Sequence, residues 1–222
     1  MTTPTMDTPV REPKAESFLD WFRINSRLVT IAAVVVAAAV FGFWFYNRSA
    51  VLKAESADRK LLAAKQSLGS GNLPLAQSDL KKIADQYPST SAGAEAGMLL
   101  AQVKLEQGDA QGAVTSLKEL SGKNATGPYA TPVRVLLGDA YSQLGKYAEA
   151  AAEYERASLL TTAPNERALL LGKIGRSQSA AGNAAKAREA WEALANQTDN
   201  AGLAAEARVR LGELLATSAK KS

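Results

Sequence analysis

The chain has 222 residues, of which 46% are hydrophobic but only 6% aromatic, and its formal net charge is +4. It contains no cysteine and no histidine, which excludes disulfides, thiolate nucleophiles and metal sites built on these ligands, and removes the most common general base. Alanine, leucine, glutamate, lysine and glutamine are abundant, and these residues favour helix. We therefore predict an all-α protein with no cofactor, and an enzyme is the least expected function.

Basic residues are spread along the chain, whereas a nucleic-acid-binding surface shows a basic stripe with interleaved aromatic residues. Glu149 and Glu153 are four residues apart, and we interpret them as exposed carboxylates on one helix face rather than as an acid–base pair. The charge pattern indicates a solvated surface, so we expect neither a nucleic acid nor a small-molecule substrate as a partner.

The N-terminal part of the chain predicts a membrane anchor. Residues 1–16 are rich in proline and threonine and are expected to form a disordered tail, and residues 17–27 an interfacial segment. Residues 28–46 contain no charge; as a helix they would be ~28 Å long, close to the ~30 Å hydrocarbon core of a bilayer. We predict a single transmembrane helix there, in contact with lipid. The aromatic residues expected at the two membrane interfaces are Trp21, Phe22, Trp44, Phe45 and Tyr46.

A buried core helix and a cleaved signal peptide are the alternatives to this anchor. The preceding segment is long and contains acidic residues, and the apolar run ends in bulky aromatics rather than a small-residue cleavage site, which favours an uncleaved anchor. Basic residues are similarly frequent on both sides, so they do not decide the orientation. A short N-terminal tail and a large C-terminal domain favour a cytoplasmic N-terminus.

Glycine recurs at an interval of 37 residues, at Gly71, Gly108, Gly145 and Gly182. This register is typical of a helical repeat. Each glycine lies between two helix-forming stretches, where a left-handed residue ends a helix. Asn72, Asp109 and Asn183 follow as candidate caps of the next helix, and Lys146 departs from that pattern.

Small residues stand at fixed distances from these glycines, where two antiparallel helices would cross closely. A larger side chain there would overpack the crossing, at a cost of ~1–3 kcal/mol. Tyr154, nine residues after Gly145, is interpreted as a core residue between stacked helices. The small residues five after the glycines are Ala76, Ala113, Ala150 and Ala187. Gly138 and Gly175 stand seven before a repeat glycine, and Gly212 continues their series at the same interval of 37 residues.

Each unit is thus predicted to be a helical hairpin that buries its apolar face against its neighbours. Residues 203–217 repeat only the first helix, as expected of a terminal cap. We predict an α-solenoid of about four hairpins plus a capping helix over residues 47–217, followed by a tail at 218–222.

The repeat resembles the tetratricopeptide repeat. The family's pattern of Leu-Gly, aromatic, Gly, Ala, aromatic and Ala is matched by Leu137, Gly138, Tyr141, Gly145, Ala150, Tyr154 and Ala157. The interval is three residues longer than the usual ~34, and the resemblance covers about residues 55–217. It implies a scaffold that binds other proteins.

The whole layout is also similar to the YfgM-like ancillary subunits of the bacterial SecYEG translocon. Two stretches carry this similarity, FGFWFYNRSAVLKAESA (41–57) and AAGNAAKAREAWEAL (180–194). The similarity implies a single-pass protein of the bacterial inner membrane, with a periplasmic domain that contacts the translocon and chaperones.

In tetratricopeptide proteins the first helices line a concave groove for a partner peptide. Carried over, this implies an apolar row of Leu61, Met98, Val135, Gly172 and Val209, and a polar row of Lys65, Gln102, Asp139, Arg176 and Glu213. The polar row lacks the run of lysine, arginine and asparagine with which some family members grip a terminal carboxylate. It suits an extended or helical segment; alternatively, these side chains are only solvated.

Two functions remain open, besides an enzyme as the least expected one. The first is a scaffold that assists secretion, folding or assembly near a translocon or chaperones. The second is a structural or accessory subunit of another membrane complex, held by its transmembrane helix. In that case the small-residue face of Ala33, Ala37 and Gly42 would contact neighbouring helices.

Overall fold

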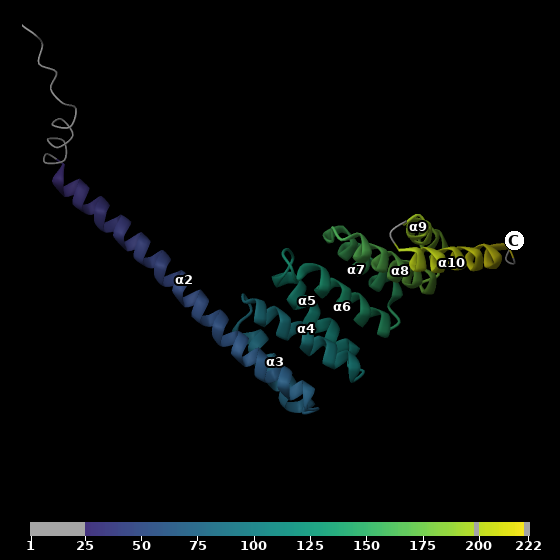
Figure 1. The fold of residues 1–222 in the computed structure, drawn as a ribbon, viewed down its shortest axis with the longest axis horizontal. Helices are drawn as coiled ribbons and strands as arrows, with labels where there is room; N and C mark the ends of the chain where they lie inside the picture. Colours follow the sequence, from purple (N-terminus) through teal and green to yellow (C-terminus); the bar gives the residue numbers. More distant parts are fainter. Residues whose placement is uncertain (1–24, 198–199, 220–222) are drawn as a thin grey trace, which may run out of the picture. The chain divides into compact units, whose positions relative to one another are not determined.

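The computed structural model describes residues 25–197 and 200–219. All regular secondary structure within these ranges is helical, which confirms the all-α prediction. The predicted tail 1–16, most of the interfacial segment with Trp21 and Phe22, and residues 220–222 lie outside the described residues. The helices, labelled in Figure 1, are α2 (Ser26–Gly69), α3 (Leu73–Gln86), α4 (Ser91–Glu106), α5 (Ala110–Lys123), α6 (Ala130–Gln143), α7 (Tyr147–Leu160), α8 (Pro164–Ala180), α9 (Ala184–Ala195) and α10 (Ala201–Ala219).

The chain divides into two compact units, residues 1–52 and 53–222. The described part of the first unit is the N-terminal portion of α2, and none of its residues is buried. This portion is long and apolar enough to cross a membrane, with a mean hydropathy of 2.5 over its most apolar window. The segment 28–46 is not a separate helix, because α2 continues without a break to Gly69. Trp44, Phe45 and Tyr46 are 58%, 62% and 73% exposed.

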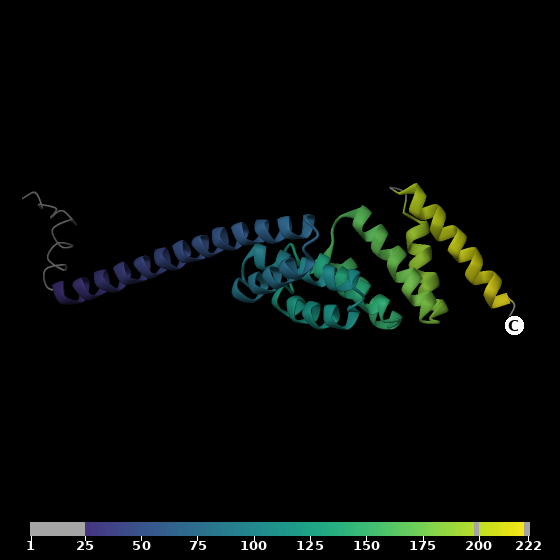
Figure 2. The same cartoon turned by 90° about the horizontal axis from the view of Figure 1, so that it is seen from below.

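The second unit consists of antiparallel helical hairpins. Residues 53–69 of α2, together with α4, α6 and α8, are the first helices, and α3, α5, α7 and α9 are the second helices. Consecutive helices from α3 to α10 pack on one another, and the first helices α4 and α6, and α8 and α10, are also in contact. Figure 2 shows α8, α9 and α10 side by side, so α10 takes the place of a first helix.

Each hairpin closes through the same hydrogen-bonded turn. In the third, Gly145 has φ of 70°, its N–H donates to the carbonyl of Ser142, and the N–H of Lys146 donates to the carbonyl of Tyr141. This pair of bonds satisfies the last carbonyls of the first helix and requires a left-handed residue, which favours glycine. The other repeat glycines, Gly71, Gly108 and Gly182, have φ of 77°, 81° and 79°.

The cap residues after these glycines do not behave alike. Oδ1 of Asn72 accepts from the N–H of Leu75, and Oδ1 of Asp109 accepts from the N–H of Gly112. The expectation of a cap at Asn183 was wrong, because its side chain instead donates to Oε1 of the buried Gln178.

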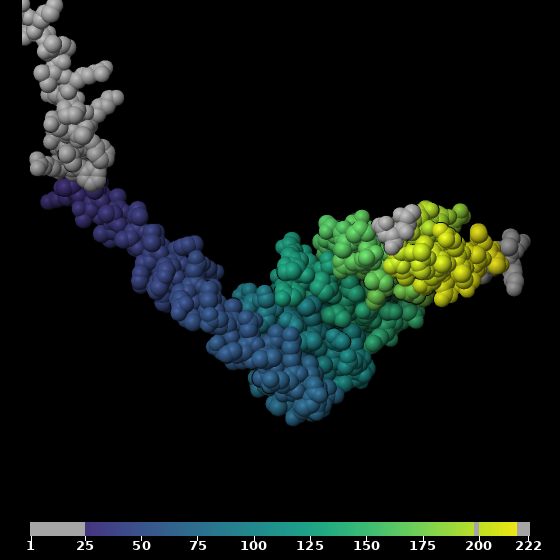
Figure 3. All heavy atoms as spheres, in the orientation of Figure 1, coloured from purple at the N-terminus to yellow at the C-terminus, as the bar shows by residue number. Residues whose placement is uncertain are grey.

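Close helix crossings explain the small residues of the repeat. A Cβ on Gly138 would lie 2.4 Å from the ring of Tyr154, and a Cβ on Gly175 would lie 2.5 Å from Trp191. Gly212 holds the same register position on α10, yet nothing lies within 4 Å of its would-be Cβ, because no second helix follows α10 in the described residues. One face of α10 is exposed to solvent (Figure 3). The alanines Ala76, Ala113, Ala150 and Ala187 are fully buried.

Candidate functional site

The apolar row does not form a continuous exposed strip. Leu61 is only 5% exposed and belongs to the core that α3 and α4 complete, and Gly172 is also buried. Met98 and Val135 are partly buried against the central core, whereas Val209 is 61% exposed. A partner could therefore contact Met98, Val135 and Val209, but not Leu61 or Gly172.

The polar row is accessible, and ion pairs join it from one first helix to the next. Nζ of Lys65 on α2 lies 2.5 Å from Oε1 of Glu95 on α4. Nη1 of Arg176 on α8 lies 2.9 Å from Oε1 of Glu206 on α10. Lys173 on α8 pairs with Asp139 on α6 in the same way. We call these three pairs the inter-helix ladder; it places the polar row on one surface of the first helices, which we call the inner surface.

The remaining two members of the polar row interact within their own helices. Nε2 of Gln102 lies 3.4 Å from Oε1 of Glu106, and Nη1 of Arg210 lies 2.9 Å from Oε2 of Glu213. Both are exposed. The row thus alternates cationic, neutral and anionic side chains, each with a hydrogen-bonding partner.

Sequence reasoning missed the ladder partners, although a signal for them exists. Glu95 stands seven residues before Gln102, and Glu206 stands seven residues before Glu213. Lys173 stands three residues before Arg176. Spacings of three and seven place side chains on the same helix face. An opposite charge at such a spacing on the next first helix could therefore have been used to predict the pairs.

Two side chains, Tyr154 and Lys173, hold Asp139 in place. The hydroxyl of Tyr154 donates to Oδ1 of Asp139 over 2.6 Å, and Nζ of Lys173 lies 5.1 Å from the centre of the tyrosine ring. Burial raises the pKa of Tyr154, and the hydrogen bond to Asp139 raises it further. The tyrosine therefore stays a neutral donor that holds the carboxylate in place.

The expectation that Glu153 is an exposed carboxylate was wrong. Glu153 is 6% exposed, because Nη1 of Arg134 on α6 lies 3.0 Å from its Oε2 and Arg156 pairs with its other oxygen. Two guanidinium groups satisfy both oxygens, so the carboxylate ties α7 to α6. Glu149 is exposed as expected.

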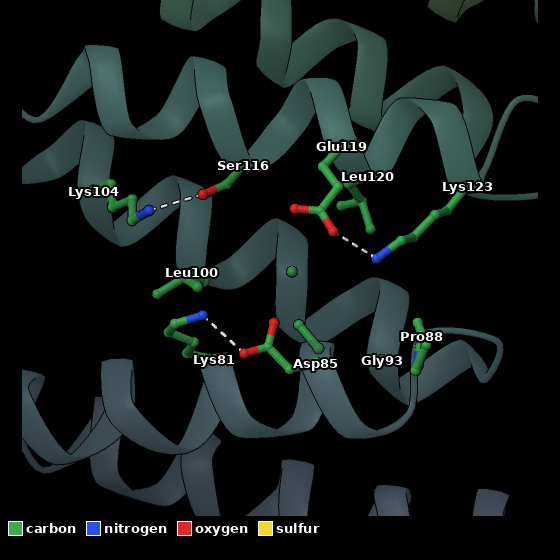
Figure 4. A pocket seen from close by; sticks show the side chains of 12 residues that line it. Lys81, Asp85, Pro88, Gly93, Leu100, Lys104, Ser116, Glu119, Leu120 and Lys123 are labelled. Carbon is green, nitrogen blue, oxygen red and sulfur yellow. Dashed lines mark hydrogen bonds and ion pairs between the residues drawn. The ribbon is translucent and has the colours of Figure 1, made fainter.

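A small cavity of about 110 Å³ lies between α3, α4 and α5 (Figure 4). Lys81 pairs with Asp85 at 2.8 Å and Lys123 with Glu119 at 2.7 Å, while Nζ of Lys104 donates to Ser116. The cavity is smaller than the ~300–1,000 Å³ of typical ligand sites, and its cations already have partners. In the described residues, no group of three or more acidic side chains is placed to hold a metal ion.

Comparison with solved structures shows the same fold in other proteins. A tetratricopeptide repeat protein from Parabacteroides merdae is 15% identical with a TM-score of 0.61, over 73% of this chain and 61% of that one. The chain thus spans less than two thirds of that protein. Pseudomonas aeruginosa PilF is 21% identical with a TM-score of 0.57, over 76% of this chain and 71% of that one. MamA is 22% identical with a TM-score of 0.51, over 71% and 95% of the two chains.

No curated protein matches the chain. Two overlapping stretches, residues 20–137 and 57–176, match the sequence profile of the family described as tetratricopeptide repeat-like domain. Such stacked repeats present extended binding surfaces. Because each stretch covers more than half of the chain, this protein belongs to the tetratricopeptide repeat-like domain family, whose fold typically serves as a non-catalytic scaffold for protein interactions.

Proposed function

We propose that this protein is a membrane-anchored scaffold that binds segments of other proteins along the inner surface of its repeat domain. The observation that carries the proposal is the polar row, which runs through all five first-helix positions from α2 to α10. Its alternating charges suit an extended or helical segment that makes contacts over several repeats. Met98, Val135 and Val209 add apolar contacts beside the row.

The anchor in this proposal is the apolar part of α2. Large side chains such as Leu28, Val36 and Phe43 are 67%, 61% and 68% exposed. Burying each of them in lipid instead would stabilise the molecule by roughly 1.5–3 kcal/mol. The family match also begins at residue 20 and so includes this apolar segment.

The proposal also includes a location and partners for the protein. The N-terminus lies in the cytoplasm and the repeat domain in the periplasm of a bacterium, beside the inner membrane. The scaffold then assists secretion, folding or assembly near a translocon or its chaperones. The absence of cysteine leaves the domain's stability independent of the oxidising conditions of that compartment.

A second candidate function is a subunit of another membrane complex, held by its transmembrane helix. It is favoured by a shallow apolar groove along α2, lined by small residues that include Ala33 and Ala37 and bordered by Phe41 and Trp44. Small residues allow a second helix to approach closely in lipid. Gly42 is not part of this lining.

Site-specific photocrosslinking in intact cells tests the main proposal. A photoreactive phenylalanine replaces Gln102, which is exposed on the inner surface, or Thr115, which is exposed on the second helix α5 and serves as the control. We expect discrete protein adducts from position 102 and none from 115. Equal labelling at both positions, or none at 102, would contradict the proposal.

Exchange of the anchor separates the two candidate functions. Replacing residues 28–46 with an unrelated transmembrane helix should leave the adducts at position 102 intact if the repeat domain binds the partner. Loss of the adducts would favour the membrane-complex subunit. An alkaline phosphatase fused after residue 222 reports the orientation, and it should be active if the domain is periplasmic.

A further inference from the structure

The indole of Trp191 on α9 lacks a hydrogen-bonding partner. The residue is 1% exposed, and its Nε1 is buried without an acceptor in the described part of the structure. Buried indole N–H groups normally find a partner. The unsatisfied donor therefore needs an explanation.

The repeat register provides one. Trp191 stands 37 residues after Tyr154, and each aromatic ring packs on the glycine of its own crossing, Gly175 and Gly138. Tyr154 donates to Asp139 of the polar row. The row position 37 residues after Asp139 is Arg176, whose guanidinium has donors only. In the third repeat Asp139 accepts the hydrogen bond of the aromatic residue, whereas in the fourth repeat the cation Arg176 stands at that position and cannot accept.

A cavity of about 350 Å³ lies between α8, α9 and α10, and Trp191 is one of the residues that line it. This volume lies within the ~300–1,000 Å³ typical of ligand sites. Its lining is formed by Arg176, Ser179, Trp191, Arg210, Glu213 and Leu214. Because this part of the inner surface includes two members of the polar row, the cavity lies at the C-terminal end of the surface assigned above to partner segments.

The charges of the cavity favour a neutral acceptor. Arg176 already pairs with Glu206 and Arg210 with Glu213, each at 2.9 Å. An added carboxylate would be repelled by these two carboxylates, whereas an amide carbonyl carries no net charge and would not be. Leu214 is partly buried and offers an apolar wall beside these polar groups.

We propose that this cavity binds a backbone carbonyl of a partner polypeptide, which accepts from Nε1–H of Trp191 while an adjacent aliphatic side chain packs against Leu214. Because Nε1 is buried, the carbonyl reaches it only after a side chain of the cavity wall moves. We assign this movement to Arg176 or Arg210, which line the cavity and are 50% and 46% exposed. The proposal rests on the scaffold function and names one of its subsites.

The test uses the full-length protein in detergent, with Trp21 and Trp44 changed to phenylalanine so that Trp191 gives the single indole ¹H–¹⁵N signal. The probe is N-acetyl-leucine-N-methylamide, and N-acetylleucine is its charged counterpart. We expect the amide to move the indole proton downfield with saturation, and the carboxylate to bind at least several-fold more weakly. An unchanged signal, or tighter binding of the carboxylate, overturns the proposal.

Arg176→Gln provides a variant that keeps the tryptophan and supplies an internal acceptor at the polar-row position. We expect its indole proton to lie downfield without probe and to lose most of the probe-induced shift. Arg188→Gln is the matched control, because it removes an exposed ion pair with Glu192 on α9 and lies outside the cavity. Equal probe binding by both variants contradicts the proposal.

The crosslinking result at position 102 separates this subsite from the scaffold function. Adducts at 102 without a response of Trp191 to the amide probe would overturn the subsite and leave the function standing. A response of Trp191 without adducts at 102 would support the cavity as a carbonyl site and overturn the scaffold function.

Discussion

The hydroxyl of Tyr154 donates a 2.6 Å hydrogen bond to Oδ1 of Asp139, which lies 15 residues earlier on the neighbouring helix. Tyr154 is 3% exposed, whereas Asp139 belongs to the polar row and also pairs with Lys173. A core position of the repeat is thereby linked to the inner surface. Packing between helices and the orientation of a predicted binding residue depend on the same side chain.

The change Tyr154→Phe tests this link. It removes the hydroxyl and leaves the ring against Gly138, so we expect a loss of about 1 kcal/mol in the free energy of unfolding. Thermal unfolding should show a midpoint about 2–4 °C lower. Tyr147→Phe, at a tyrosine that is 37% exposed, is the control and should change the midpoint little. Equal effects of the two substitutions would show that the bond to Asp139 contributes nothing.

The same tyrosine predicts a pH dependence at alkaline pH. Burial and the bond to Asp139 raise the pKa of Tyr154 above its ordinary value of 10.0, so the folded state keeps a proton that the unfolded state loses. This stabilisation is complete below about pH 10 and is lost progressively above it. The thermal midpoint of the unmodified protein should therefore fall more steeply above about pH 10 than that of Tyr154→Phe. Parallel curves would contradict the prediction, since lysine deprotonation is common to both proteins.

Alanine substitutions at Gly138 and Gly212 distinguish a glycine required by a close helix crossing from one that only lowers helix propensity. A Cβ on Gly138 would lie 2.4 Å from the ring of Tyr154, so Gly138→Ala should destabilise the repeat domain by about 1–3 kcal/mol. At Gly212 the would-be Cβ has nothing within 4 Å, and Gly212→Ala should stabilise α10 by roughly 0.5–1 kcal/mol. Urea unfolding followed by circular dichroism measures both. Effects of the same sign would refute the assignment of Gly138 to a crossing.

The sequence predicted the helical class and the hairpin repeat because both follow from a periodic register. The interval of 37 residues places Gly145 at a turn, where the backbone has positive φ, and it places Tyr154 in the core. Periodicity gives the face on which a residue lies, but not the side chain that meets it from the next helix. For this reason Leu61 was assigned to a binding row although it is buried, and Glu153 to the surface although two arginines enclose it.

The sequence pattern also did not predict that α2 continues without a break to Gly69. Hydropathy changes near residue 46, which suggests a boundary, but no proline interrupts the helix there. A change of environment along a helix does not require a change of backbone. The missing acceptor of Trp191 could have been found from the register, since Arg176 stands where Asp139 serves Tyr154.

Because two arginines enclose the carboxylate of Glu153, we expect its removal to lower the free energy of unfolding more than removal of an exposed glutamate does. In Glu153→Ala, Arg134 would lose its ion-pair partner while its side chain remains 22% exposed. We expect a loss of roughly 1.5–3 kcal/mol in the free energy of unfolding, the range for hydrogen bonds to charged groups. Glu189→Ala, at an exposed position of α9, should stay within about 0.5 kcal/mol. Chemical unfolding compares the two, and a small effect at position 153 would show that Arg134 finds another partner without cost.

The proposed anchor is tested by placing charge in the apolar part of α2. Val35 and Val36 are both 61% exposed and lie near the middle of residues 28–46. Changing both to arginine costs about 2.5–3.5 kcal/mol per residue at the centre of a bilayer, so the variant should be released from membranes by alkaline washing. The control changes Leu62 and Leu169, which are 60% and 55% exposed in the repeat domain, to arginine and should remain in the membrane fraction. Retention of both variants would show that another part of the chain, or a partner, holds the protein at the membrane.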